Sequence, residues 1–203
     1  MKLNDKTTIV TGASGGVGIE LVKELLNKGA TVIAVNRNTE SLFKFRESLS
    51  SADRLHIYSV DVTQRDQVNN AVTEMLKQVG HLDGLINNAG IIQPFIPVAS
   101  LDWSKIKQVM NVNFYGQLNF IKALLPEFLS RPEAHIINIG SMGGFLPVPG
   151  QVVYGVSKAA TLILNAMEKN KLSIRIGKDS KIFFFLYKFF PKFAIHTISK
   201  FLK

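Results

Sequence analysis

The segment Thr11-Gly12-Ala13-Ser14-Gly15-Gly16-Val17-Gly18 connects a β-branched run to a helical pattern, and this connection decides the fold. The run Thr7–Thr11 is predicted to be a strand, and Val17–Lys28 an amphipathic helix. The apolar face of that helix is formed by Leu21, Val22, Leu25 and Leu26. Glycines at such a turn let backbone N–H groups approach a pyrophosphate, which the positive end of the helix dipole also attracts.

The glycine spacing in this turn is Gly-x-x-x-Gly-x-Gly, whereas the commoner dinucleotide fingerprint is Gly-x-Gly-x-x-Gly. A glycine-rich turn that binds nothing is the alternative, and the position between a strand and a helix argues against it. We therefore expect a phosphate-binding turn formed by Gly12, Ser14, Gly15, Gly16, Val17 and Gly18.

The same alternation of strand and helix patterns continues to about residue 140. Further strands are predicted at Thr31–Val35, Leu55–Val60, Gly84–Ile86 and His135–Ile139. Further helices are predicted at Thr39–Leu49, Gln64–Val79, Trp103–Leu129 and from about Tyr154 to Lys169. Such alternation is typical of parallel strands joined by right-handed helical crossovers. The sequence therefore predicts a Rossmann-like, doubly wound parallel sheet in a three-layer α/β/α arrangement.

The basic charge of the protein is concentrated at one end of the sequence. The chain has 203 residues, of which 46% are hydrophobic, and a formal charge of +9. Residues 1–168 are almost neutral, whereas residues 169–203 contain nine Lys and Arg, with Asp179 as the only acid. We therefore expect a globular domain over 1–168, a basic, Phe-rich strand–helix tail over 169–203, and no nucleic-acid binding.

No part of the sequence indicates export, membrane crossing or metal binding. The N-terminus lacks an apolar signal-peptide region, and no run of about 18 apolar residues is present. The chain has no cysteine, which excludes disulfides, thiolate zinc sites and cysteine nucleophiles. We expect the mature chain to begin at Met1, a cytoplasmic location and no metal site.

Two polar pairs follow the second and third predicted strands. Asn36-Arg37 stands where an acid would bind a ribose 2′-hydroxyl, and an arginine there instead attracts a 2′-phosphate. Arg37 therefore favours NADP over NAD, although surface arginines are also common by chance. Asp61-Val62 is expected to contact an adenine edge, and the alternative for Asp61 is the N-cap of the following helix.

Asn87-Asn88-Ala89-Gly90 follows the fourth predicted strand, at the sheet edge where ligands bind in this architecture. Asparagine amides can hold neighbouring strand ends together, and Ala-Gly leaves room for a flat ligand. An ordinary turn is the alternative. The residues expected to bind a cofactor here are Asn88, Ala89 and Gly90.

Ser141, Tyr154 and Lys158 form the candidate catalytic group. Tyr154 and Lys158 are spaced i, i+4 on one predicted helix, so their side chains lie on the same face. A free tyrosine has a pKa of about 10, and a nearby lysine cation lowers it by favouring the phenolate. Tyr154 is thus a candidate general acid–base, and Ser141 a hydrogen-bond donor to a developing oxyanion. A Tyr–Lys pair at this spacing also occurs on ordinary solvated helices.

Through about residue 165 the chain resembles the classical short-chain dehydrogenase/reductase family. The motifs are Thr-Gly-x-x-x-Gly-x-Gly at 11–18, Asn-Asn-Ala-Gly at 87–90 and Tyr-x-x-x-Lys at 154–158. The resemblance implies that Asn113 anchors a water-mediated proton relay, that Ser141 positions a carbonyl, and that Tyr154 transfers the proton. It also implies that Lys158 holds the nicotinamide ribose and acidifies Tyr154, and that Asn36-Arg37 belongs to the NADP-preferring type.

The sequence departs from the family after the Tyr-x-x-x-Lys helix. Family members usually continue into a sixth strand, a Pro-Gly turn beside the nicotinamide and a lid over the substrate. Here Glu168-Lys169-Asn170-Lys171 leads directly into a predicted strand over 172–177 and the basic tail, which resembles the far C-terminus of the family. We therefore expect an internal segment to be missing and the activity to be impaired.

The apolar run Ile182–Phe190 in the tail is too short to span a bilayer. It is expected to pack on the sheet or on a second subunit, and peripheral membrane contact through 178–203 is the alternative.

The sequence thus predicts an NADP(H)-dependent oxidoreductase that interconverts a small-molecule carbonyl and a secondary alcohol, in a homo-oligomer. The alternative is a catalytically impaired dinucleotide-binding protein or fragment whose tail mediates membrane or protein contacts. The segments expected to shape the substrate site are Ile91–Val98 and Gly143–Val153.

Overall fold

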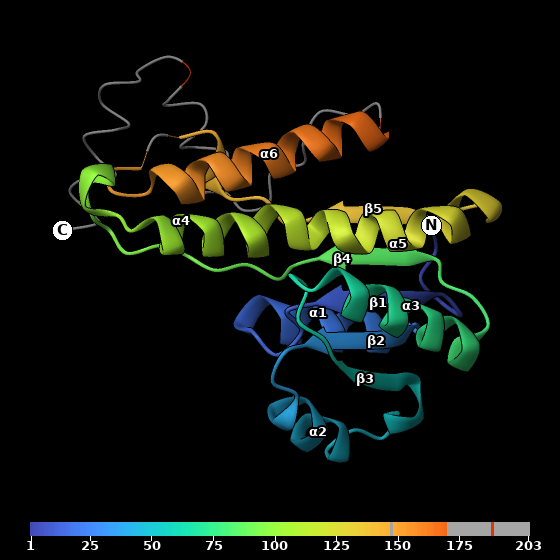
Figure 1. Ribbon diagram of the computed structural model, residues 1–203. Helices are drawn as coiled ribbons and strands as arrows, with labels where there is room; N and C mark the ends of the chain where they lie inside the picture. Colours follow the sequence, from blue (N-terminus) through green and yellow to red (C-terminus); the bar gives the residue numbers. More distant parts are fainter. Residues whose placement is uncertain (147, 170–187, 189–203) are drawn as a thin grey trace. The chain divides into compact units, whose positions relative to one another are not determined.

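The computed structural model describes residues 1–146, 148–169 and 188 (Figure 1). The chain folds into two compact units. The first unit comprises Met1–Gly90 and Tyr115–Ile139. The second comprises Ile91–Phe114 and the described residues from Gly140 onward.

The first unit contains a five-stranded parallel sheet in the order β3-β2-β1-β4-β5. The strands are β1 (Thr7–Thr11), β2 (Thr31–Asn36), β3 (Leu55–Ser59), β4 (Gly84–Asn87) and β5 (His135–Asn138). All five agree with the predicted strands to within one residue at each end. Because the strand order reverses between β1 and β4, the carboxyl ends of these two strands are neighbours at the position where such sheets bind ligands.

Helices pack on both faces of this sheet, which confirms the predicted doubly wound fold (Figure 1). On one face, Val22, Leu25 and Leu26 of α1 (Gly16–Asn27) and Leu42 of α2 (Glu40–Glu47) pack with β-strand residues such as Val10. Side chains alternate along a strand, so the buried Ile9 faces the other side. There α5 (Gly116–Ser130) contacts β4 and β5, and α3 (Arg65–Val79) packs on α5.

The second unit is built around α6 (Val152–Lys169), which begins two residues before the predicted start. It packs on α4 (Trp103–Met110) and on the 3-10 turn η4 (Met142–Gly144). A second 3-10 turn, η2 (Val98–Ser100), precedes α4. The core of this unit contains Leu101, Val109 and Val153, with Ile91, Ile96, Ile106 and Met110 packed against them.

The single helix predicted over Trp103–Leu129 is wrong in one respect. The chain forms α4, then a π-helical stretch η3 (Asn111–Tyr115), then α5. A π-helical turn accommodates an extra residue within a helix and is frequent at functional sites. Here it contains Asn113, whose fully buried amide both donates to and accepts from the backbone of Ile91.

The predicted boundary between residues 168 and 169 lies at the end of α6. The strand predicted over 172–177 and the apolar run Ile182–Phe190 lie outside the described residues, apart from Lys188. Among the helices of the described part of the chain, none has the length and apolar character needed to cross a membrane.

Candidate active site

The glycine-rich turn of the first unit contains two glycines that the local packing requires. Gly12 has a φ of +63°, and a Cβ on it would lie 2.7 Å from the Cα of Ala89. A Cβ on Gly18 would collide with the backbone oxygen of Gly12 and lie 2.9 Å from the Cα of Ala13. At these two positions the turn packs closely on the segment that follows β4 and on the start of α1, so their glycines are explained without a ligand.

The other two glycines of the turn face open space. A Cβ on Gly16 would meet no atom within 4 Å, and one on Gly15 would meet only the backbone oxygen of Gly12 at 3.5 Å. Gly15 is the N-cap of α1, no side chain caps it, and the first turn of the helix contains no acid. The exposed N-terminus of α1 therefore has the space and the polarity to receive an anionic group such as a pyrophosphate.

Asn87 at the end of β4 and Asn88 after it hold neighbouring strand ends together, as the sequence predicts. Asn87 Nδ2 donates to Asn138 Oδ1 at 2.8 Å, which connects the ends of β4 and β5. Asn88 Nδ2 donates to the backbone oxygens of Thr11 at 3.1 Å and Gly12 at 3.0 Å. The Asn-Asn-Ala-Gly segment is thus part of the same structure as the glycine-rich turn.

Arg37 lies exposed just after β2, beside the partly buried Asn36. Asn36 Nδ2 donates to the backbone oxygen of Asn38 at 2.6 Å. Within the described part of the chain, the Arg37 guanidinium makes no hydrogen bond or ion pair, and only its backbone oxygen is engaged, by Ser59. The guanidinium is therefore available to a ligand.

The structure corrects the alternative role of Asp61. The N-cap of α3 is Gln64, three residues later. The carboxylate of Asp61 instead accepts from the backbone N–H and the hydroxyl of Thr63, at 2.9 and 2.8 Å. An Asx turn thus separates the end of β3 from the helix. The adjacent Val62 is buried, and its backbone oxygen accepts from Asn119 at 2.9 Å.

All four candidate catalytic residues belong to the second unit, where a hydrogen-bonded chain connects two of them. Asn113 Nδ2 donates to Ser157 Oγ at 3.0 Å, and that hydroxyl donates to the backbone oxygen of Tyr154 at 2.8 Å. Asn113 and Ser157 are fully buried. The π-helical stretch and the first turn of α6 are therefore connected through side chains that exclude water.

Ser141 is placed by glycine contacts between η4 and α6. Its Oγ accepts the backbone N–H of Gly143 at 3.2 Å, which caps the turn. A Cβ on Gly143 would lie 3.3 Å from the ring of Tyr154, and one on Gly155 would lie 2.9 Å from the backbone oxygen of Gly143. Only glycine permits this approach, so the turn that carries Ser141 lies directly against the residue proposed to transfer the proton.

Lys158 lies one helical turn after Tyr154 and is 4% exposed. Burial lowers the pKa of its ammonium group to about 8, because the charged form loses hydration. A Cβ on Gly144 would lie 2.8 Å from the carbonyl carbon of Lys158, so η4 packs closely on this turn of the helix as well.

Gln93, Gln151 and Ser157 belong to the same hydrogen-bonded network. None of them was predicted individually, although the two glutamines lie in the segments expected to shape the substrate site. Gln93 accepts from the backbone of Tyr154, and Gln151 donates to the backbone of Gln93. Ser157 lies within the Tyr-x-x-x-Lys motif, directly before Lys158, and this position could have identified it as a candidate site residue. The two glutamines belong to no recognisable pattern.

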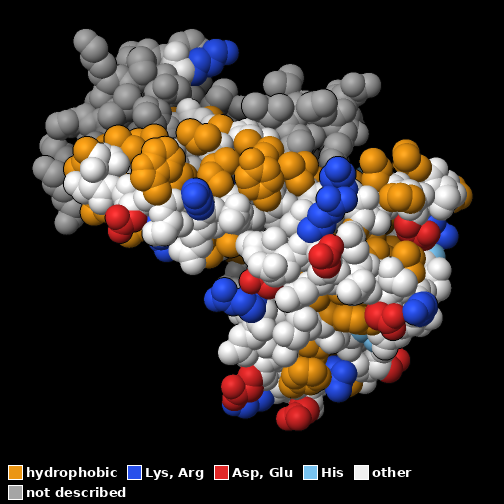
Figure 2. All heavy atoms as spheres, in the orientation of Figure 1, with side chains coloured by type: hydrophobic (Ala, Val, Ile, Leu, Met, Phe, Trp, Pro, Cys, Tyr) orange, Lys and Arg blue, Asp and Glu red, His pale blue; other side chains and the backbone are white. Residues whose placement is uncertain are grey.

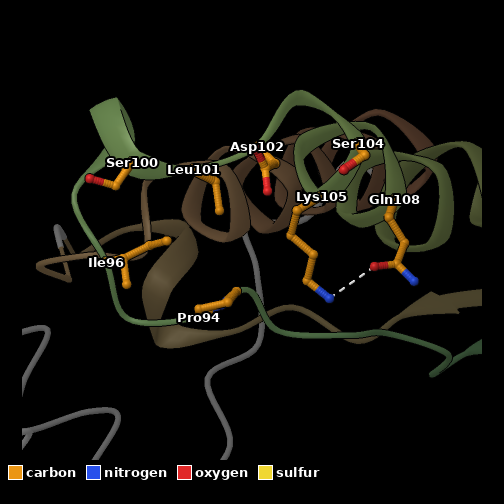
Figure 3. Close-up of a pocket in the computed structure, with 8 residues that line it drawn as sticks. All are labelled: Pro94, Ile96, Ser100, Leu101, Asp102, Ser104, Lys105 and Gln108. Atoms are coloured by element: carbon orange, nitrogen blue, oxygen red, sulfur yellow. Dashed lines mark hydrogen bonds between the residues drawn. The ribbon is translucent and has the colours of Figure 1, made fainter.

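The second unit also contains an open cleft of about 490 Å³ between the segment that follows Ile91 and the start of α4 (Figure 3). Lys105 Nζ donates to Gln108 Oε1 at 2.9 Å across its wall. The residues that line it are Pro94, Ile96, Ser100, Leu101, Asp102, Ser104, Lys105 and Gln108. None of the four candidate catalytic residues is among them, so we assign the cleft no part in the chemistry.

Comparison with known families matches residues 6–175 to the short chain dehydrogenase model. An uncharacterized oxidoreductase of Staphylococcus epidermidis is 31% identical over 169 residues, which is 83% of this chain and 72% of the relative. The 3-oxoacyl-[acyl-carrier-protein] reductase FabG of Thermotoga maritima is 33% identical over 167 residues, or 80% of this chain and 66% of the relative.

Solved structures show the same similarity. NAD⁺-bound xylitol dehydrogenase superimposes with a TM-score of 0.77 at 29% identity, over 82% of this chain and 65% of that one. ElxO with NADP bound superimposes with a TM-score of 0.74 at 28% identity, over 79% of this chain and 65% of that one. The chain thus spans about two thirds of the length of these proteins.

Proposed function

The chain belongs to the short-chain dehydrogenase family, and on that premise we propose that it is an NADP(H)-dependent oxidoreductase that interconverts a carbonyl and a secondary alcohol. Members of this family are oxidoreductases that bind a nicotinamide dinucleotide and act on small molecules. The observation that carries the proposal is the first part of α6. There Tyr154 lies against the Ser141 turn, one helical turn before the buried Lys158.

The cofactor is proposed to bind along the carboxyl edge of the sheet in the first unit. The open positions Gly15 and Gly16 and the uncapped start of α1 support pyrophosphate binding. Asp61 and Val62 are proposed to contact the adenine. Asn88, Ala89 and Gly90 are proposed to contact the half of the cofactor that carries the nicotinamide. Lys158 is proposed to bind the nicotinamide ribose. When bound, the nicotinamide supplies or accepts the hydride at the carbonyl carbon.

The chain's own residues are proposed to manage the proton. In reduction, the Tyr154 hydroxyl donates its proton to the oxygen that gains charge, and Ser141 Oγ–H stabilises that oxygen by a hydrogen bond. The resulting phenolate is favoured by the Lys158 cation. Asn113 is proposed to anchor a water-mediated relay that returns the proton to Tyr154. Oxidation of an alcohol uses the same groups in reverse.

The preference for NADP(H) rests on Arg37. Its guanidinium has no partner within the described residues, and neither Asn36 nor Asn38 beside it is an acid. A 2′-phosphate there gains a charge-assisted hydrogen bond that a 2′-hydroxyl does not. The similar structures include one with NAD⁺ and one with NADP bound, so the preference depends on this residue alone.

One experiment tests the function. The purified protein is titrated with NADPH and NADH, and turnover is then measured on a panel of ketones and aldehydes with Tyr154→Phe in parallel. We expect binding of NADPH, measurable reduction of at least one carbonyl, and loss of turnover with retained NADPH binding in Tyr154→Phe. Tyr58→Phe, which removes an exposed hydroxyl that donates to Gln78, is the control and should keep turnover. Near-normal reduction by Tyr154→Phe would contradict the mechanism.

We also propose that turnover is slow, because the sequence after α6 contains no Pro-Gly pair, the turn that usually lies beside the nicotinamide in this family. A site without such a turn admits water, which weakens stabilisation of the oxyanion. A second candidate function follows from the same departure, namely dinucleotide binding without efficient catalysis, with the basic tail over 178–203 contacting a membrane or a protein. NADPH binding without turnover on any carbonyl would favour this second candidate.

Self-association into a homo-oligomer is proposed from exposed apolar side chains in both units. In the first unit Leu129 of α5 is 77% exposed, and in the second Trp103 of α4 is 76% exposed. Hydrophobic side chains, drawn in orange, are visible at the surface in the view of Figure 2. Light scattering on the purified protein tests this proposal, and a monomer at micromolar concentration would contradict it.

A further inference from the structure

Gln93 connects the segment after Ile91 to the start of α6 through three hydrogen bonds. Its Nε2 donates to the backbone oxygen of Gly150 at 2.8 Å, and its Oε1 accepts the backbone N–H of Tyr154 at 2.9 Å. Its backbone oxygen accepts from Gln151 Nε2 at 3.0 Å. Gln93 and Gln151 are each 2% exposed, so these bonds form away from water.

Through these hydrogen bonds the N-terminus of α6 is capped by a side chain other than that of its N-cap residue. The first turn of a helix has backbone N–H groups with no partner inside the helix, and the N-cap side chain commonly satisfies one of them. Gln151 precedes the first residue of α6, and its backbone oxygen accepts from Gly155 at 2.8 Å, so it occupies the N-cap position. Its side chain bonds to Gln93, and Gln93 in turn caps the N–H of Tyr154.

The backbone of Tyr154 is thus held at both of its polar groups. Its N–H donates to Gln93, and its carbonyl oxygen accepts from Ser157, which is bonded to Asn113. The turn before the helix is packed on the segment that contains Gln93. Gly150 has a φ of +73°, and a Cβ on it would lie 2.9 Å from the backbone of Phe95.

We propose that Gln93 is a positioning residue for the proton transfer by Tyr154. This inference rests on the proposed function, and it adds a residue outside the Ser–Tyr–Lys group. Proton transfer requires the hydroxyl to lie within hydrogen-bond reach of the reacting oxygen, and small displacements of a catalytic group reduce the rate strongly. Gln93 fixes the backbone from which the Tyr154 side chain extends, and therefore the position of the hydroxyl against the Ser141 turn.

The test compares Gln93→Met, which keeps the length of the side chain and removes both amide bonds, with Gln78→Met. Gln78 is an exposed residue of α3 that accepts from the hydroxyl of Tyr58 at 2.6 Å, so the control removes one side-chain bond in the first unit. Hydrogen exchange of the segment 150–158 is followed by mass spectrometry, together with kcat, the KM for the carbonyl and the Kd for NADPH.

For Gln93→Met we expect faster exchange at the start of α6 and a fall in kcat of about tenfold to a hundredfold. The Kd for NADPH should change less than about threefold, because the phosphate-binding turn is untouched, and Gln78→Met should match the parent throughout. Unchanged exchange at 150–158, or an unchanged kcat with faster exchange, would overturn the proposal. A parallel loss of NADPH binding and thermal stability would also overturn it, by assigning Gln93 a structural role only.

Gln93→Glu provides a second, independent readout. The carboxylate still accepts from the Tyr154 N–H, but it cannot donate to Gly150 and it places a negative charge beside the tyrosine. We expect the pKa of the catalytic group in the pH–rate profile to rise, because a nearby negative charge disfavours the phenolate. An unshifted profile would contradict the assignment. If the parent protein binds NADPH and reduces no carbonyl, the proposed function fails, whereas hydrogen exchange still tests the contact to Tyr154.

Discussion

Lys158 follows Tyr154 by one turn of α6, and its side chain is almost completely buried. Helical spacing accounts for the first fact, because residues i and i+4 lie on the same face. The burial of the Lys158 side chain has an energetic consequence, because it lowers the pKa of the ammonium group to about 8. The buried position of Lys158, which we propose to hold the nicotinamide ribose, is therefore costly to the fold.

Lys158→Met should stabilise the free protein while abolishing turnover. Burial holds the pKa of Lys158 at about 8 against an ordinary value of 10.5, and the lost hydration of the charged form destabilises the folded protein by about 3 kcal/mol at neutral pH. Between pH 8 and 10.5 the unfolded chain binds more protons than the folded one, so the stability of the parent should rise with pH across that window. Urea unfolding at several pH values should show this rise in the parent and its absence in Lys158→Met. The exposed Lys77→Met should behave like the parent, and a destabilised Lys158→Met would contradict the argument.

Alanine at Gly16 and at Gly18 should separate cofactor binding from folding. The added Cβ at Gly16 has open space in the free protein, so the melting temperature should not fall. The same Cβ occupies the space assigned to the pyrophosphate, and the Kd values for NADPH and NADH should both rise at least tenfold. At Gly18 the Cβ collides with the backbone of Gly12 and Ala13, and the protein should lose stability by at least about 1–3 kcal/mol. Calorimetric titration and thermal melts measure both effects, and unaltered cofactor binding by Gly16→Ala would exclude this turn as the phosphate site.

Arg37→Asp should reverse the order of cofactor affinities. The parent should bind NADPH more tightly than NADH by about 1.5–3 kcal/mol, the contribution of a charge-assisted hydrogen bond. An aspartate at this position repels the 2′-phosphate and accepts from a 2′-hydroxyl. Lys77→Asp makes a similar change of charge on α3 and should leave the order of the two cofactor affinities unchanged. Equal affinities for the two cofactors in the parent would defeat the assignment of Arg37.

Asp83→Asn should destabilise the first unit strongly. The buried carboxylate accepts from the backbone N–H of Thr7 at 3.0 Å, Arg131 at 2.8 Å and Lys6 at 3.3 Å. Burial alone would raise the pKa of Asp83, but these hydrogen bonds and the nearby positive charge of Lys6 together hold it below the ordinary value. Removing the charge weakens the hydrogen bonds of the buried Asp83 side chain to the partly exposed Lys6 and Arg131, and it should cost about 1–3 kcal/mol.

The lowered pKa of Asp83 also has a pH signature. The stabilisation is fully present above the ordinary carboxyl pKa and is lost as the pH falls through the folded-state value. Acid unfolding of the parent should therefore be steeper than that of Asp83→Asn. Glu74→Gln, which removes a surface ion pair with Lys77, is the matched control and should change the unfolding free energy by less than about 1 kcal/mol. An Asp83→Asn protein as stable as its parent would refute the role of this cluster.

The sequence by itself determined the five strands, the glycine-rich turn and the pairing of Tyr154 with Lys158. These depend on local periodicity and on the backbone freedom of glycine, and both can be read from neighbouring residues. The contacts of Asn87 and Asn88 were predictable for the same reason, because the ends of parallel strands meet at one edge of the sheet.

Only the tertiary structure decided which distant groups satisfy the buried amides. Gln93 bonds to residues 57 and 61 positions away, and no local pattern specifies such partners. The π-helical stretch around Asn113 was predicted as ordinary helix for the same reason, because its stabilising contacts are to Ile91 and Ser157. Asp61 bonds to Thr63 rather than capping α3, since the helix begins at Arg65, within one residue of its predicted start, and Gln64 is its N-cap. The burial that lowers the pKa of Lys158 likewise arises from packing, because the desolvation of a charge depends on what surrounds it in space.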